Sequence, residues 1–207
     1  MPSAGGLSIV IAFSIATLVL IPMLTSTTAP IKSYLSYTLP VVGAGWIIAL
    51  TGLIDDVKEL SAKKKMIGIL LAASLVWFLT DFRLNDFKIP FGGPLLHFEP
   101  WLSYLLTVIW IVAITNAVNL IDGLDGLVSG VSIISLVTMG IVSYFFLPVP
   151  NLFLTMTIFV LVASIAGFFP FNYHPAILYL GDTGALFIGF MISVLSLQGL
   201  KMQRQLQ

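Results

Sequence analysis

The acidic residues of this chain concentrate in three short polar motifs, each at the end of a long apolar run. Six of the nine Asp and Glu residues lie there: Asp55, Asp56, Glu59, Asp122, Asp125 and Asp182. Carboxylate and amide oxygens are the ligands that Mg²⁺ prefers, usually together with substrate phosphates. Lysines beside the first motif also suit phosphate. The motifs therefore predict a site that handles a phosphate-rich substrate.

The first motif places two adjacent carboxylates, Asp55 and Asp56, after Gly52 and before a run of lysines that ends at Lys65. Adjacent carboxylates at the end of an apolar segment are costly unless they are paired, hydrated or bound to a metal. The alternative is a solvated helix end that the lysines balance, because such surface pairs are common and weak. This motif alone leaves both interpretations open.

The second motif repeats a polar residue at every third position. Its members are Asn116, Asn119, Asp122 and Asp125. A spacing of three places them along one helical stripe, and Gly123 and Gly126 allow the backbone to turn or to approach a ligand closely. The alternative is a polar turn whose aspartates cap a helix.

The third motif runs from residue 171 to residue 184 and contains Asp182 just before an apolar segment. Either Asp182 serves the site, or it only caps the N-terminus of the following helix. His174 in the same motif is interpreted as a local structural or interfacial histidine, and His97 is interpreted as incidental.

Composition sets the class of protein that must position these motifs. The chain has 207 residues, is 58% hydrophobic and 9% charged, and has a mean hydropathy of +1.08. Soluble domains carry roughly 25% charged residues, so this is a membrane protein and residues 1–207 are predicted to form a single transmembrane domain. Zero net charge argues against a nucleic-acid partner. The lack of cysteine excludes disulfides and thiolate metal sites.

Continuous apolar runs predict an all-α, polytopic bundle of about seven transmembrane helices. The runs are residues 7–24, 39–54, 66–79, 101–114, 127–147, 152–169 and 184–200. The polar segment 81–99 contains prolines and glycines, and it predicts an extracytoplasmic loop or small hairpin.

Counting crossings sorts the loops by membrane face, because each span crosses once. The three motifs and Gly5-Gly6 then share one face, whereas Asp81, Asp86 and Glu99 fall on the other. The lysine cluster 63–65 predicts that the face with the motifs is cytoplasmic, in the cell membrane.

At these motifs the sequence resembles the polyprenyl-phosphate N-acetylhexosamine-1-phosphate transferase family, and most closely its bacterial undecaprenyl-phosphate N-acetylglucosaminyl-1-phosphate transferases. The strings that carry the resemblance are PSAGGL at 2–7, GLIDDVKELSAKKK at 52–65, NAVNLIDGLDGL at 116–127 and GDTGALFIGF at 181–190. The resemblance implies transfer of GlcNAc-1-phosphate from UDP-GlcNAc to undecaprenyl phosphate with release of UMP. Such a step begins the synthesis of a cell-wall polymer of the teichoic acid or O-antigen type.

The resemblance also implies roles for matching residues. Asn119 and Asp182 match the ligands of Mg²⁺, with Mn²⁺ as a substitute metal. Asp55 and Asp56 match the pair associated with the lipid phosphate and its activation. Direct attack by the lipid phosphate and a covalent aspartyl intermediate both stay open. Asp122 is the third catalytic candidate.

The remaining candidates are expected to bind substrate. Lys65 matches the lysine that holds the diphosphate, Gly123 and Asp125 match the uracil-binding positions, and Tyr179 matches the aromatic that stacks on the base. Asn116 completes this set, and the partners are UDP-GlcNAc, undecaprenyl phosphate and, in a homodimer, a second copy of the chain.

The chain also departs from the family pattern. Members usually have ten or eleven spans and a later cytoplasmic loop with histidine and arginine, and the motif GDxGS here ends in Ala185. The chain is therefore interpreted as a fragment truncated at both ends. The alternatives are an inactive truncated membrane subunit and a cation-coupled transporter, which predicts mid-span charges and repeat symmetry.

Overall fold

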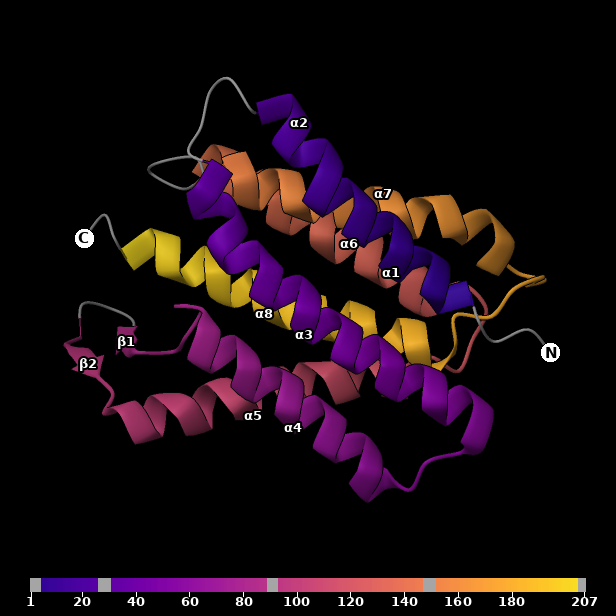
Figure 1. Cartoon of the computed structure of the whole chain (residues 1–207), viewed down its shortest axis with the longest axis horizontal. Coiled ribbons are helices and arrows are strands. Elements are labelled where there is room, and N and C mark those ends of the chain that lie inside the picture. The colour runs from indigo at the N-terminus through magenta and orange to yellow at the C-terminus, as the bar shows by residue number, and fades with distance from the viewer. Residues whose placement is uncertain (1–4, 26–30, 89–92, 147–151, 205–207) are drawn as a thin grey trace.

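The structure is a computed structural model, which describes residues 5–25, 31–88, 93–146 and 152–204. Nearly all described elements are helical (Figure 1). The helices are α1 (Gly5–Ile15), π-helical η1 (Ala16–Leu20), α2 (Ile21–Thr25), α3 (Ile31–Lys58), α4 (Ala62–Leu79), α5 (Pro100–Leu120), α6 (Leu127–Ile141), π-helical η2 (Val142–Phe146), α7 (Leu152–Asn172) and α8 (Gly181–Arg204). The strands are β1 (Asp86–Lys88) and β2 (Leu95–His97).

Six helical segments among the described residues are long and apolar enough to cross a membrane. They are Gly5–Met23, Tyr34–Lys58, Pro100–Leu120, Leu127–Phe146, Leu152–Asn172 and Gly181–Leu200. Of the seven expected spans, α4 is the one missing from these six. It has 18 residues but carries three lysines in its first turn. Helices satisfy their own backbone hydrogen bonds, as lipid requires. The predicted all-α, multi-pass membrane bundle is confirmed.

Helix α8 forms the centre of the bundle. In its apolar segment 78% of the residues are buried, compared with 28–47% in the other five candidate spans. Helices α1, α3, α5 and α7 pack against it, and Figure 1 shows α3 crossing in front of it. Between Asp182 and Lys201 helix α8 carries no charged residue, which suits such a central position.

The second span is longer at both ends than the apolar run predicted. Helix α3 begins at Ile31 rather than at residue 39, and it contains Pro40. It also continues to Lys58, so Asp55 and Asp56 lie in its last turns and not in a loop. The apolar run stopped at the first charges, but a helix can continue through the interface where water solvates them.

The fourth span likewise extends beyond its apolar run. Helix α5 ends at Leu120 rather than at residue 114, so Asn116 and Asn119 are helical. Asp122 and Asp125 follow in the turn before α6. The expected helical stripe of four residues is therefore wrong in its second half, because the chain turns there and Gly126 adopts φ +71°.

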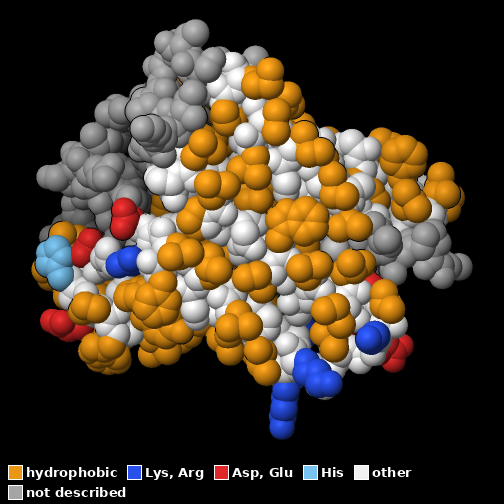
Figure 2. All heavy atoms as spheres, viewed as in Figure 1, with side chains coloured by type: hydrophobic (Ala, Val, Ile, Leu, Met, Phe, Trp, Pro, Cys, Tyr) orange, Lys and Arg blue, Asp and Glu red, His pale blue; other side chains and the backbone are white. Residues whose placement is uncertain are grey.

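Segment 81–99 contains the predicted hairpin. Strands β1 and β2 pair antiparallel with Asp86 opposite His97, and the two side chains meet at 2.6 Å. In Figure 1 the hairpin and the C-terminal end of α8 lie at the left, whereas the first turn of α1 lies at the right. Figure 2 shows hydrophobic side chains across the middle of this face and charged side chains toward its two ends.

The hairpin and the start of α4 lie at opposite ends of the bundle, so the predicted membrane orientation can be tested by labelling single cysteines. The chain has no native cysteine that would interfere. We expect His97→Cys, at a side chain that is 73% exposed, to react with a membrane-impermeant maleimide in intact cells. Lys63→Cys, at the other end of the bundle, should react only after permeabilisation. The reverse labelling pattern would show that the proposed orientation is inverted.

Candidate active site

The site forms where the start of α1, the end of α3 and the start of α8 meet. The backbone N–H groups of Gly5 and Gly6 donate to the carbonyls of Tyr179 at 3.2 Å and Leu180 at 3.0 Å. A Cβ at Gly6 would lie 2.2 Å from the Gly184 nitrogen, so only glycine permits this approach. Of the N-terminal motif, residues 2–4 lie outside the described residues.

Lys65 joins the first and third motifs by direct contact. Its Nζ atom lies 2.5 Å from Asp55 Oδ2 and 2.9 Å from Asp182 Oδ2. The second motif adds Asn119, whose amide donates to Asp182 Oδ1. The predicted convergence of the motifs on one end of the bundle is therefore confirmed.

Asp55 is the most deeply buried acid of this cluster. Its side chain is 7% exposed, compared with 29% for the acid Asp182 and 20% for their shared partner Lys65. A buried carboxylate is costly unless it is paired and hydrogen-bonded. Lys65 supplies the pairing, and the backbone N–H of Leu60 donates to Asp55 Oδ1 at 2.5 Å.

Asp56 turns toward the first turn of α8. Its Oδ1 accepts the backbone N–H of Asp182 at 2.8 Å, and its Oδ2 accepts the N–H of Thr183 at 3.1 Å and the Thr183 hydroxyl at 2.6 Å. Asp56 therefore caps α8 from another helix. The alternative that Asp182 itself is the cap is wrong, because Asp182 lies inside the first turn.

Asp122 lies beside this cluster, in the turn after α5. Burial, and after it the nearby carboxylates of Asp182 and Asp56, raise the pKa of Asp122 to about 6. The structure thus brings the third catalytic candidate into the electrostatic field of the other acids.

A pocket of about 200 Å³ opens next to Asp122. It is lined by Asp122, Gly123, Leu124, Asp125, Asn172, Tyr179, Leu180 and Gly181. Asp125 Oδ2 accepts the N–H of Ala176 at 3.1 Å and contacts His174 Nδ1 at 3.0 Å. The Ala176 hydrogen bond, followed by that of His174, lowers the pKa of Asp125. Gly123, Asp125 and Tyr179 thus line one pocket, and their role in binding uracil stays a prediction.

Asn116 is placed differently. Its amide donates to the Val112 carbonyl of its own helix at 2.8 Å, one turn away from Asn119. Its predicted role in substrate binding stays a prediction.

Two polar residues that sequence reasoning passed over help to build the site. Thr183 is fully buried and donates to Asp56. Asn172 accepts from Ser129 at 2.9 Å and donates to the Leu178 carbonyl at 3.1 Å, which ties α6, α7 and the segment before α8 together. Their signal in the sequence was only their place within the third motif.

Asn119 and Asp182 carry oxygen atoms of the kind that Mg²⁺ prefers. The described residues contain no group of three or more His, Cys, Asp and Glu side chains that would form a complete metal cage. Mg²⁺ does not need one, because it typically binds one or two carboxylates together with waters and substrate phosphates. Asn119 and Asp182 adjoin and both carry hard oxygen atoms, provided that Asn119 presents its oxygen instead of its amide nitrogen.

Comparison with known proteins agrees with the motifs. Residues 38–200 match the family described as Glycosyl transferase family 4. A Bacillus subtilis (strain 168) protein described as "Probable undecaprenyl-phosphate N-acetylglucosaminyl 1-phosphate transferase" is 41% identical over 201 residues, which cover 97% of this chain and 52% of that protein. The phospho-N-acetylmuramoyl-pentapeptide-transferase of Staphylococcus saprophyticus is 36% identical over 95% of this chain and 61% of its own length. That of Oceanobacillus iheyensis is 30% identical over 95% and 60%.

The chain thus spans about half to three fifths of the length of these relatives. The family match itself covers most of the chain and includes Asp55, Asp56, Lys65, Asn119, Asp122, Asp125 and Asp182. The residues that meet at the end of the bundle are those that carried the resemblance, and the chain belongs to glycosyl transferase family 4.

Proposed function

We propose that the protein transfers GlcNAc-1-phosphate from UDP-GlcNAc to undecaprenyl phosphate and releases UMP. The reaction takes place at the cytoplasmic face of the cell membrane and begins the synthesis of a cell-wall polymer. The observation that carries this proposal is the Lys65 contact that joins Asp55 and Asp182 beside Asn119 at one end of a membrane bundle. The name of the Bacillus subtilis relative supports the choice of substrates.

Phosphoryl transfer requires alignment and charge neutralisation more than covalent chemistry from the protein. Asn119 and Asp182 would hold Mg²⁺, which when bound neutralises charge on the diphosphate and on the departing UMP. Lys65 adds a second positive charge for the diphosphate. An oxygen of the lipid phosphate forms the new bond to the β-phosphorus as the bond to UMP breaks. Asp55 or Asp122 would accept the proton of that lipid phosphate.

The neighbouring pocket suits the uridine end of the sugar nucleotide. Among the described residues, His174 and Ala176 donate to Asp125, and both donate to its Oδ2 atom. The Oδ1 atom of Asp125 therefore faces no donor among them and can accept an N–H group of the base. Tyr179 lines the same pocket and offers a ring for stacking. Asp122 borders both the pocket and the acidic cluster, so a base in the pocket would lie beside the proposed phosphate site.

The test is a transfer assay in membranes that contain the protein. We expect radiolabel from UDP-GlcNAc to enter an undecaprenyl-linked product with release of UMP, and we expect a chelator to stop the reaction. UDP-N-acetylmuramoyl-pentapeptide serves as the competing donor, because several relatives are named for that substrate. Label transfer from the pentapeptide donor alone would contradict the proposed substrate, and no transfer from either donor would contradict the activity.

A further inference from the structure

Asp55 and Asp56 are neighbours in the sequence, but their carboxylates contact different parts of the site. Asp55 contacts Lys65 and the backbone of Leu60. The described contacts of the Asp56 carboxylate are all with Asp182 and Thr183, the first residues after Gly181 in α8. Its two oxygens thus serve the backbone of one helix end.

Helix α8 needs this cap. The first four N–H groups of a helix lack partners within the helix. The residues that precede Asp182 are Leu180 and Gly181, which have no side-chain acceptor. Asp56 binds two of the free N–H groups, and its negative charge suits the positive end of the helix dipole.

The distance between the two helices is set by backbone contact. Gly52 lies one turn before Asp56 on α3, and a Cβ there would be 2.5 Å from the Thr183 Cα atom. Helix α3 therefore lies directly against the first turn of α8. This close approach lets the short Asp56 side chain reach the α8 backbone.

Asp182 is consequently held at two points. Its backbone N–H is bound by Asp56, and its carboxylate is bound by Lys65 and Asn119. We propose that Asp56 is a positioning residue that fixes the first turn of α8, so that the Asp182 carboxylate meets Lys65 and Asn119. Asp56 then acts through Asp182 and does not touch the substrate. This inference rests on the proposed function for its kinetic consequences.

The test compares Asp56→Asn with Asp56→Ala. Asparagine keeps one of the two acceptor oxygens and therefore part of the cap, but it lacks the charge and cannot accept a proton. We expect kcat of Asp56→Asn to stay within about tenfold of the wild type. We expect kcat of Asp56→Ala to fall about 100-fold, because a displacement near 1 Å costs about that much. Glu59→Gln, a nearby exposed acid, is the matched control and should behave like the wild type.

Mn²⁺ binding, measured by electron paramagnetic resonance, provides a readout other than turnover. Asp56→Ala should bind Mn²⁺ about tenfold more weakly than the wild type, as is typical when support of a ligand is lost, and Asp56→Asn, which keeps part of the cap, should bind it more tightly than Asp56→Ala. Thr183→Val removes one of the three donors to Asp56 and should show a smaller loss. It keeps the comparison valid if Asp56→Ala does not fold, which size-exclusion chromatography would show.

The outcomes distinguish a failure of the positioning role of Asp56 from a failure of the proposed function. If Asp56→Asn is as inactive as Asp56→Ala while both bind Mn²⁺ normally, Asp56 acts on the substrate and the positioning role is refuted, but the proposed function stands. If Asp56→Ala and Thr183→Val match the wild type in both readouts, the positioning role is also refuted. If the wild type neither transfers GlcNAc-phosphate nor binds Mn²⁺, the proposed function fails and this inference fails with it.

Discussion

Asp182→Asn is expected to abolish transfer of GlcNAc-phosphate. Asparagine keeps the shape of the side chain but removes its charge, so the proposed Mg²⁺ pair would lose its anionic member. The substitution also removes the ion pair with Lys65 at 2.9 Å. Loss of an electrostatic element of this kind should lower kcat on the order of a thousandfold, or about 4 kcal/mol of barrier.

The measurement is radiolabelled transfer to undecaprenyl phosphate across a range of Mg²⁺ concentrations. Asp86→Asn is the matched control, because it makes the same change in the hairpin at the opposite end of the bundle. It should leave transfer within about twofold of the wild type, because its partner His97 lies in the same hairpin and neither residue touches the site. Wild-type turnover by Asp182→Asn would refute the metal assignment.

Lys65→Met is expected to impair both activity and stability. Lys65 forms ion pairs with both Asp55 and Asp182, and the Asp55 side chain is only 7% exposed. Removing one partner of a buried pair leaves an uncompensated charge, which typically costs about 3 kcal/mol of stability or more. If Lys65 holds the diphosphate as proposed, loss of its charge should also reduce kcat at least 100-fold.

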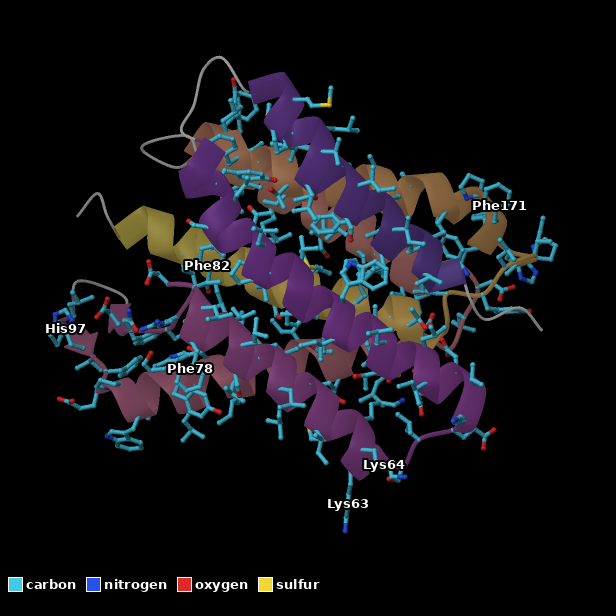
Figure 3. All side chains as sticks on the ribbon, in the orientation of Figure 1. Lys63, Lys64, Phe78, Phe82, His97 and Phe171 are labelled. Atoms are coloured by element: carbon cyan, nitrogen blue, oxygen red, sulfur yellow. The ribbon has the colours of Figure 1, made fainter. Side chains whose placement is uncertain are left out.

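Lys63→Met is the matched control, because it makes the same substitution two residues earlier. Figure 3 shows Lys63 pointing away from the helices, and its side chain is exposed. We expect its melting temperature in detergent and its transfer rate to equal those of the wild type. If both variants behave alike, the effect comes from general surface charge and the specific role of Lys65 is wrong.

Several features could be predicted from the sequence because they depend on local rules. A mean hydropathy of +1.08 and continuous apolar runs were enough for a multi-pass helical bundle. The predicted ends of the helices were less accurate than the predicted number and type of elements. Apolar runs end at the first polar or charged residues, whereas α3 and α5 continue through the interface. The polar segment with its prolines and glycines was enough for the hairpin of β1 and β2.

The sequence by itself also determined that the three motifs share one face. Each of the seven predicted apolar runs, that of α4 included, reverses the chain, so this count places Asp55, Asn119 and Asp182 at the same end of the bundle. The contacts of Lys65 with Asp55 and Asp182, and of Asn119 with Asp182, agree with that count.

Only the tertiary structure decided which partner each of these side chains meets. Asp55 and Asp56 look equivalent as an adjacent pair, but neighbouring residues on a helix point about 100° apart. One carboxylate therefore reaches Lys65, and the other reaches the start of α8, 126 residues later in the chain. Local sequence rules do not specify such a long-range contact, because it depends on how closely α3 and α8 pack. That distance is set by Gly52, whose missing side chain lets the two backbones touch.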